Sequence, residues 1–200
     1  MTARLSREQV LAPLARLRSD EIVVTTMGAV RPWAALSDSP LDFASADSAM
    51  GHAADFALGI ALARPERRVI CLNGDGSMLM TLGTLVTIAD SGATNLVLFV
   101  LSNRTYEITG NQRVPGGGEV DFAAMARAAG FPRAHSFDEP DSYRQELPGI
   151  VRGAGPVLVN LRVQAGSEGP LSRGTQKEPP YLHVSLAESA RRLRAELAGE

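Results

Sequence analysis

Apolar residues along the chain form either short continuous runs or stripes at helical spacing. Val10, Leu11, Leu14 and Leu17 make such a stripe behind Ser6, which predicts a helix capped by that serine. Further helices are predicted at 51–63, 77–90, 121–129, 140–151 and 186–197. Strands are predicted at 21–25, 68–72, 95–101, 133–137 and 156–162.

The predicted strands are apolar throughout and lack the alternation of a half-exposed sheet. The run NLVLFVL at 95–101 is the clearest example. Such strands, alternating with helices, are typical of parallel sheets that are covered on both sides. We therefore predict an α/β fold: a three-layer, doubly wound, mainly parallel sheet with helices on both faces. Residues 28–48 and 103–120 are predicted to be loops with little regular structure.

The composition fits one domain over residues 1–200. Of the 200 residues, 44% are hydrophobic, which is enough for a single well-buried core. We place this core at 20–165, and we expect 166–200 to form a surface loop and a C-terminal helix. The net charge of −2 gives no basic surface of the kind that a nucleic acid or an anionic membrane would favour.

The only cysteine, Cys71, excludes an internal disulfide framework and a metal site of several thiolates. It lies in an apolar run, so we expect a buried structural thiol rather than a nucleophile. The N-terminal segment is polar and charged, unlike a signal peptide, and no apolar run approaches the roughly 20 residues that span a bilayer. These features predict a cytoplasmic protein.

Candidate chemistry is concentrated at Gly74-Asp75-Gly76-Ser77, between a predicted strand and a predicted helix. The two glycines let a phosphate approach the backbone, and the start of a helix offers free amides to an anion. Asp75 would repel a diphosphate there unless a divalent cation such as Mg²⁺ lay between them. The alternative is an ordinary capping or turn aspartate.

A second oxygen ligand is expected from a neighbouring strand, and Asn103 is the candidate. It follows the strand at 95–101 and lies 28 residues after Asp75, room for one helix and one returning strand. A strand–helix–strand unit of this kind would place both side chains above adjacent parallel strands. Alone, Asn103 would be interpreted as a turn residue at a strand end.

This pattern, Gly74-Asp75-Gly76 followed at a distance by Asn103, resembles the cofactor-binding motif of the thiamine diphosphate (ThDP) 2-oxoacid decarboxylase and acetolactate synthase superfamily, in its C-terminal domain. That family usually has two asparagines at the end of the motif, whereas here the first is Ser102. The resemblance covers about residues 20–165. It implies that Mg²⁺ is bound by Asp75, Asn103 and the main-chain carbonyl of Thr105.

The resemblance also implies how this chain would hold the cofactor. Met50 would be the apolar wedge beneath the thiazolium ring, although it could be ordinary core, and the carbonyl of Ser48 would accept from the 4′-amino group. His52 could face the substrate as a catalytic group or be a simple helix histidine. Tyr106 and Glu107 could point into the pocket or have a structural role. The cofactor-binding residues implied are Thr25, Thr26, Ser48, Met50, Gly74, Asp75, Gly76, Ser77, Asn103, Thr105 and Tyr106.

Two segments, 50–53 (MGHA) and 109–112 (TGNQ), look most like the phosphonopyruvate and sulfopyruvate decarboxylase branch. The 2-oxo acid of that branch has an anionic tail, which Arg104, Arg113 or Arg173 could bind. Full-length members have a second domain with a glutamate that hydrogen-bonds the aminopyrimidine. This chain has no room for it, so we expect a partner subunit carrying that domain, in a dimer or a hetero-tetramer or dodecamer-type oligomer.

The function predicted from these features is that of the ThDP- and Mg²⁺-binding subunit of a two-subunit 2-oxo acid decarboxylase, which releases an aldehyde. Two alternatives stay open. One is a subunit of an acetolactate synthase-like carboligase, and the other is a ThDP-binding subunit with no turnover of its own.

Overall fold

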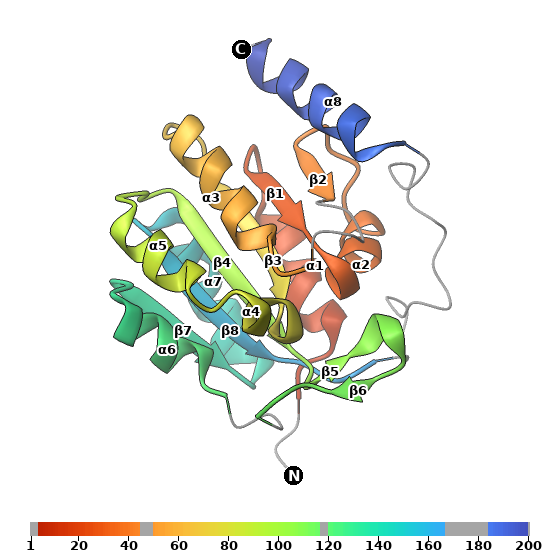
Figure 1. Cartoon of the computed structure of the whole chain (residues 1–200), viewed down its shortest axis with the longest axis vertical. Coiled ribbons are helices and arrows are strands. Elements are labelled where there is room, and N and C mark those ends of the chain that lie inside the picture. The colour runs from red at the N-terminus through yellow and green to blue at the C-terminus, as the bar shows by residue number, and fades with distance from the viewer. Residues whose placement is uncertain (1–3, 45–49, 117–119, 167–183, 200) are drawn as a thin grey trace.

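A six-stranded parallel sheet forms the centre of the molecule (Figure 1). The computed structural model describes residues 4–44, 50–116, 120–166 and 184–199. The strands lie in the order β2-β1-β3-β4-β8-β7, and every neighbouring pair is parallel. Their bounds are β1 Ile22–Thr25, β2 Asp42–Ala44, β3 Val69–Gly74, β4 Leu96–Ser102, β7 Arg133–Phe137 and β8 Val157–Arg162.

Helices cover both faces of this sheet. One face carries α3 (Ala53–Ala63), α4 (Asp75–Met80), α5 (Thr84–Asp90) and α6 (Phe122–Ala129), and α8 (Leu186–Ala198) packs at the β2 edge. The opposite face carries α1 (Arg7–Leu17), α2 (Val30–Ala34) and α7 (Pro140–Arg152). The predicted three-layer, doubly wound fold is confirmed.

The apolar strands are explained by burial on both sides. In β3, Val69 and Cys71 belong to the core on the α3 face, whereas Ile70 and Leu72 belong to the core on the α1 face. All four residues have no exposed surface. Burial raises the pKa of the Cys71 thiol well above its usual range, so the prediction of an inert, buried cysteine is confirmed.

Helix α1 begins as its sequence predicts. The Ser6 hydroxyl accepts from the backbone N–H of Gln9 at 3.1 Å, and the Gln9 side chain accepts from the backbone N–H of Ser6 at 2.8 Å. This reciprocal capping box satisfies two N–H groups that the helix cannot pair internally. The hydroxyl of Tyr143 on α7 donates to the carbonyl of Val10 at 3.1 Å, which joins the two helices on this face.

The prediction that 28–48 lacks regular structure is wrong in part. After a 3-10 turn, η1 (Met27–Ala29), the chain forms α2 and then the edge strand β2. Tertiary contacts stabilise both elements: Trp33 Nε1 donates to Asp42 Oδ1 at 3.0 Å, and Arg18 forms an ion pair with Asp42 at 3.3 Å. A local sequence pattern cannot report contacts of this kind.

Two other expected boundaries are corrected. The single helix expected at 77–90 is two helices, because the chain leaves helical geometry at Thr81, whose hydroxyl donates to the carbonyl of Gly51. The first of them, α4, begins at Asp75 rather than Ser77. The expected loop at 103–120 contains a two-stranded antiparallel ladder, β5 (Thr105–Tyr106) with β6 (Gln112–Arg113), and the turn η2 (Glu107–Thr109).

Helix α8 confirms the expected C-terminal helix, while most of the loop expected before it lies outside the described residues. Within the ranges that the structure describes, we find no helix with the length and apolar character that a membrane span requires.

Candidate functional site

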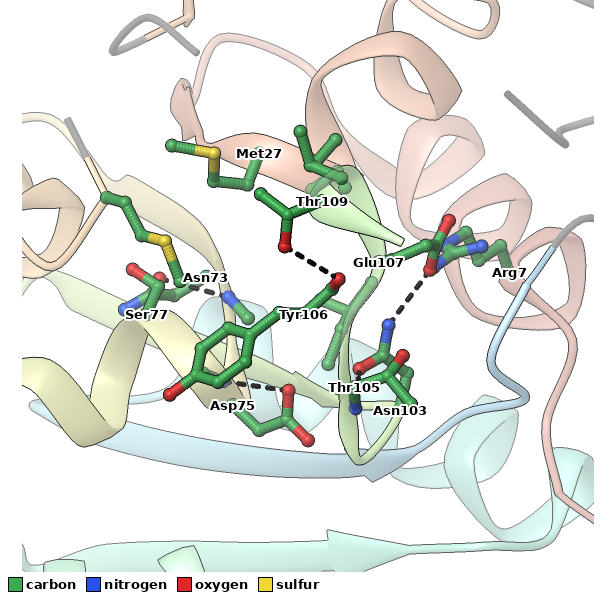
Figure 2. Close-up of a pocket in the computed structure, with 17 residues that line it drawn as sticks. Arg7, Met27, Asn73, Asp75, Ser77, Asn103, Thr105, Tyr106, Glu107 and Thr109 are labelled. Atoms are coloured by element: carbon green, nitrogen blue, oxygen red, sulfur yellow. Dashed lines mark hydrogen bonds and ion pairs between the residues drawn. The ribbon is translucent and has the colours of Figure 1, made fainter. Parts of the chain in front are cut away.

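A pocket of about 200 Å³ lies beyond the carboxyl ends of β1, β3 and β4 (Figure 2). Its walls come from α1, from η1, from the junction of β3 with α4, and from the segment that follows β4. In doubly wound sheets, ligands bind beyond the carboxyl ends of the strands, in the crevice between loops that leave neighbouring strands in opposite directions. The position agrees with the site expected from the sequence.

Asp75 is held at the point where β3 passes directly into α4. Its carboxylate is buried, and it accepts from the backbone N–H of Gly76 at 2.8 Å and from that of Arg104 at 2.7 Å. Burial raises the pKa of Asp75, and the two N–H groups and the guanidinium of Arg4 offset part of this rise. A carboxylate has about four acceptor positions, so Asp75 can still accept a cation.

Asn103 follows β4, the strand beside β3. Its Oδ1 accepts from the backbone N–H of Thr105 at 2.9 Å, and its Nδ2 donates to Glu107 Oε2 at 2.9 Å. Gly74 pairs with Leu101 in the parallel register of the two strands. The structure therefore brings Asp75 and Asn103 to one side of the same pocket, as Figure 2 shows.

The metal-ligating groups available in the pocket suit a hard cation that prefers oxygen ligands. The described residues contain no group of three or more histidine, cysteine, aspartate or glutamate side chains that could hold a metal ion. A site here would combine one carboxylate, one amide oxygen and main-chain carbonyls. Mg²⁺ accepts such a mixture and retains water in its other positions. Thr105, the expected source of a carbonyl ligand, also lines the pocket.

Gly76 and Ser77 form the floor of the pocket beside Tyr106. A Cβ atom on Gly76 would lie 2.5 Å from Cε1 of the Tyr106 ring, so the close packing of this ring requires glycine. The Ser77 hydroxyl oxygen accepts from the backbone N–H of Gly51 at 2.9 Å. Within the described part of the chain its hydrogen has no acceptor, so it is free to donate to an anion.

Met50 lines the pocket next to Gly51, whose φ of 91° lies in the left-handed region that favours glycine. The backbone N–H of Gly51 donates to the Ser77 hydroxyl, and its carbonyl accepts from the Thr81 hydroxyl, which fixes this turn against α4. The position of Met50 is thereby tied to the same helix that carries Asp75.

Other predicted site residues lie elsewhere. His52 is not part of the pocket wall; its ring is 68% exposed and contacts Asp55 at 2.9 Å. Thr25 and Thr26 are buried behind the wall, and the hydroxyl of Thr26 has no partner among the described residues. Ser48 lies outside the described residues.

Of the arginines expected to bind an anionic tail, neither Arg104 nor Arg113 lines this pocket. Arg104 lies at a smaller hollow on another side of Asp75, together with Arg4 and Arg162. Arg113 is exposed on β6, and Arg173 lies outside the described residues.

The structure adds residues that sequence reasoning missed. Met27, Gly28 and Ala29 could have been found, since they follow the carboxyl end of a predicted strand, where ligands bind. Arg7 could not, because its ion pair with Glu107 joins positions 100 residues apart and leaves no local pattern.

Comparisons with known proteins agree with this geometry. Residues 23–161 match the family model described as "Thiamine pyrophosphate enzyme, C-terminal TPP binding domain". The chain is 38% identical to a phosphonopyruvate decarboxylase of Streptomyces viridochromogenes, across 91% of this chain and 43% of that protein. It is 35% identical to a sulfopyruvate decarboxylase subunit beta of Methanothermobacter thermautotrophicus, across 82% of this chain and 84% of that one.

Among solved structures, a 4-hydroxybenzoylformate decarboxylase of Rhodococcus jostii RHA1 has the same fold. The TM-score is 0.69 at 21% identity, across 84% of this chain and 34% of that one. The chain spans less than half of the length of the phosphonopyruvate decarboxylases that it matches.

Proposed function

The chain belongs to the family of thiamine pyrophosphate enzymes, as their C-terminal cofactor-binding domain, and from this premise we propose that it is the ThDP- and Mg²⁺-binding subunit of a two-subunit 2-oxo acid decarboxylase. The proposed reaction is non-oxidative and yields CO₂ and an aldehyde from a substrate of the sulfopyruvate or phosphonopyruvate type. The observation that carries the proposal is the meeting of Asp75 and Asn103 at one side of the pocket.

We assign the magnesium ligands to Asp75, Asn103 and the carbonyl of Thr105. Ser77 supports a diphosphate next to that cation, because its hydroxyl hydrogen is free to donate while its oxygen is occupied by Gly51. Gly76 supports it by leaving the backbone open to close approach. When bound, ThDP would supply the electron sink that decarboxylation requires.

Met50, fixed through Gly51, is the proposed apolar support for the cofactor's ring system. An apolar wall there also excludes water from the reacting centre. The geometry gives no support for His52 as a catalytic group, since its exposed ring is engaged with Asp55.

The pocket wall also favours a second subunit. Its carboxylates, among the described residues, are Asp75 and Glu107, and both are engaged by hydrogen bonds within this chain. Asp75 is assigned to the cation and Glu107 is paired with Arg7, so neither is proposed as the carboxyl group that hydrogen-bonds the aminopyrimidine. We therefore propose that this glutamate comes from a partner polypeptide, consistent with the "subunit beta" in the name of the Methanothermobacter relative.

The test is to purify the chain with the product of a neighbouring reading frame that encodes a pyrimidine-binding domain. Decarboxylation of a panel of 2-oxo acids with sulfonate, phosphonate and methyl tails is then measured with and without the partner. We expect aldehyde only from the complex. Acyloin in place of aldehyde would identify a carboligase, and turnover by the lone chain would refute the split site. A complex that binds ThDP but converts no 2-oxo acid would identify a subunit without turnover of its own.

A further inference from the structure

Glu107 connects the proposed metal ligand Asn103 to the first helix of the chain. Its Oε2 accepts from Asn103 Nδ2 at 2.9 Å and forms an ion pair with Arg7 (Figure 2). The same oxygen accepts from the backbone N–H of Gly166 at 3.4 Å. The side chains of Arg7 and Glu107 are each only 10% exposed. This pair is therefore largely shielded from solvent, and it lies in the pocket wall next to Asn103.

An asparagine ligand has an orientation problem that an aspartate ligand does not have. Its amide has an oxygen end, which binds a cation, and an NH₂ end, which repels one. Turning the amide over exchanges the two ends with little change of shape. A protein that uses Asn103 as a ligand therefore gains affinity by fixing the oxygen end toward the metal.

The two neighbours of Asn103 specify the same orientation. The backbone N–H of Thr105 can only donate, so it selects Oδ1, and the carboxylate of Glu107 can only accept, so it selects Nδ2. Oδ1 keeps a second lone pair for the cation. If Glu107 were absent, the hydrogen bond from Thr105 would be the remaining selection among the described residues.

Arg7 explains how a carboxylate can be placed so near a site for an anionic diphosphate. An unpaired buried carboxylate would be costly and would repel that ligand. The guanidinium of Arg7 neutralises Glu107 and also donates to the carbonyl of Gly166 at 3.3 Å. The charge of Glu107 is thus balanced within the chain, and its hydrogen bond to Asn103 is retained.

We propose that Glu107 is a positioning residue of the magnesium site, fixing the amide of Asn103 with its oxygen toward the cation, and that Arg7 is its counter-charge. The proposal rests on the proposed function, since it needs Mg²⁺ at Asp75 and Asn103. Partners of metal ligands typically change metal affinity by about 10- to 100-fold when they are replaced.

The experiment measures the apparent Kd for Mg²⁺ of the full chain by calorimetry in excess ThDP. In Glu107→Gln the shape is kept, but the side chain can present an NH₂ group to Asn103, so either orientation becomes possible. We expect the Kd to rise about 10-fold or more. Glu188→Gln is the matched control, because Glu188 is a half-buried, arginine-paired glutamate on α8 that does not line the pocket, and we expect no change there.

Testing Glu107→Gln in a second variant, Asn103→Asp, separates the effect on amide orientation from a general structural effect of the substitution. In Asn103→Asp both ends of the ligand are oxygens, so no orientation remains to be selected, and Glu107 now faces a like charge. Glu107→Gln should therefore leave Mg²⁺ affinity unchanged or raise it in that background. An equal loss in both backgrounds would indicate a structural role and overturn the proposal, as would a Kd within about 2-fold of the original in Glu107→Gln itself.

Two further measurements check that the variant folds and that the proposed magnesium site exists. Thermal unfolding without Mg²⁺ reports whether Glu107→Gln folds. If it does not fold, Mg²⁺ binding to Arg7→Lys is measured instead, and a weaker Mg²⁺ affinity is again expected. An unchanged affinity in Arg7→Lys would refute the proposal. If the unaltered chain binds ThDP without any dependence on Mg²⁺, or if Asp75→Ala binds ThDP equally well, the proposed function itself is contradicted. A normal Asp75→Ala result with an unaffected Glu107→Gln refutes only the positioning role.

Discussion

The backbone N–H of Arg104 donates to Oδ2 of Asp75 at 2.7 Å, joining the start of α4 to the segment after β4. Arg104 adopts a φ of 68°, an uncommon value for a residue with a side chain. This turn lies between the proposed ligands Asn103 and Thr105. The hydrogen bond therefore ties the carboxylate of one strand end to the backbone that carries the other two ligands.

Replacing Asp75 should remove the proposed cation site. Asp75→Ala deletes the only charged ligand proposed, so we expect Mg²⁺-dependent ThDP binding to become undetectable by calorimetry. Asp141→Ala is the control, because Asp141 is a 91% exposed aspartate on α7, and its ThDP affinity should be that of the unaltered chain. Undiminished, metal-dependent binding in Asp75→Ala would place the cation elsewhere.

Mg²⁺ binding should depend on pH because burial raises the pKa of Asp75. In the metal-free folded chain the Asp75 carboxyl binds its proton more tightly than it does in the unfolded chain. Ionisation of Asp75 therefore destabilises the fold as pH rises from the ordinary aspartate range through the raised pKa. Mg²⁺ binds only the ionised form and offsets this loss.

The measurement is the rise in Tm caused by Mg²⁺ in excess ThDP, over a series of pH values. We expect this rise to be large above the raised pKa of Asp75 and to disappear as pH falls through it, at a higher pH than an exposed aspartate would give. Asp75→Ala should show no Mg²⁺-dependent rise at any pH. A rise that is constant down to the usual aspartate range would contradict the role of burial.

Local sequence patterns predict this structure correctly where one pattern has one structural meaning. The apolar run of β4 can be stable only when both faces are covered, and the Asp75 to Asn103 spacing fits a helical crossover and one returning strand, so the fold and the proximity of this pair were predictable. The contact of Arg7 with Glu107 depends on how α1 docks beside a loop 100 residues later, which no local pattern encodes. Likewise, the break between α4 and α5 depends on the distant carbonyl of Gly51.

Gly76 should be intolerant of any side chain. In Gly76→Ala the new Cβ would overlap the Tyr106 ring at 2.5 Å, so the ring must move from the pocket floor. We expect a loss of about 1–3 kcal/mol in the free energy of unfolding, as is typical of overpacking, and weaker ThDP binding. Denaturant unfolding and calorimetry measure the two effects.

Gly74→Ala provides a matched control two residues away. A Cβ atom on Gly74 would have no neighbour within 4 Å, and its φ of −100° suits any residue. We expect its stability to stay close to that of the unaltered chain. If the two variants lost the same stability, the packing of Tyr106 on Gly76 would not be the cause.

Tyr143 should contribute to stability through its hydroxyl, independently of the site. The hydroxyl is buried and donates to the carbonyl of Val10, which joins α7 to α1. Tyr143→Phe keeps the ring but leaves that buried carbonyl without this donor, so we expect a loss of about 1–3 kcal/mol in the free energy of unfolding. Tyr106→Phe is the control, since the Tyr106 hydroxyl has no hydrogen-bond partner within the described ranges, and it should change stability by less than about 0.5 kcal/mol. Because α1 also carries Arg7, Tyr143→Phe further tests whether a loosened helix weakens Mg²⁺ binding. A Mg²⁺ affinity equal to that of the unaltered chain would show that Arg7 is held by Glu107 without help from this contact.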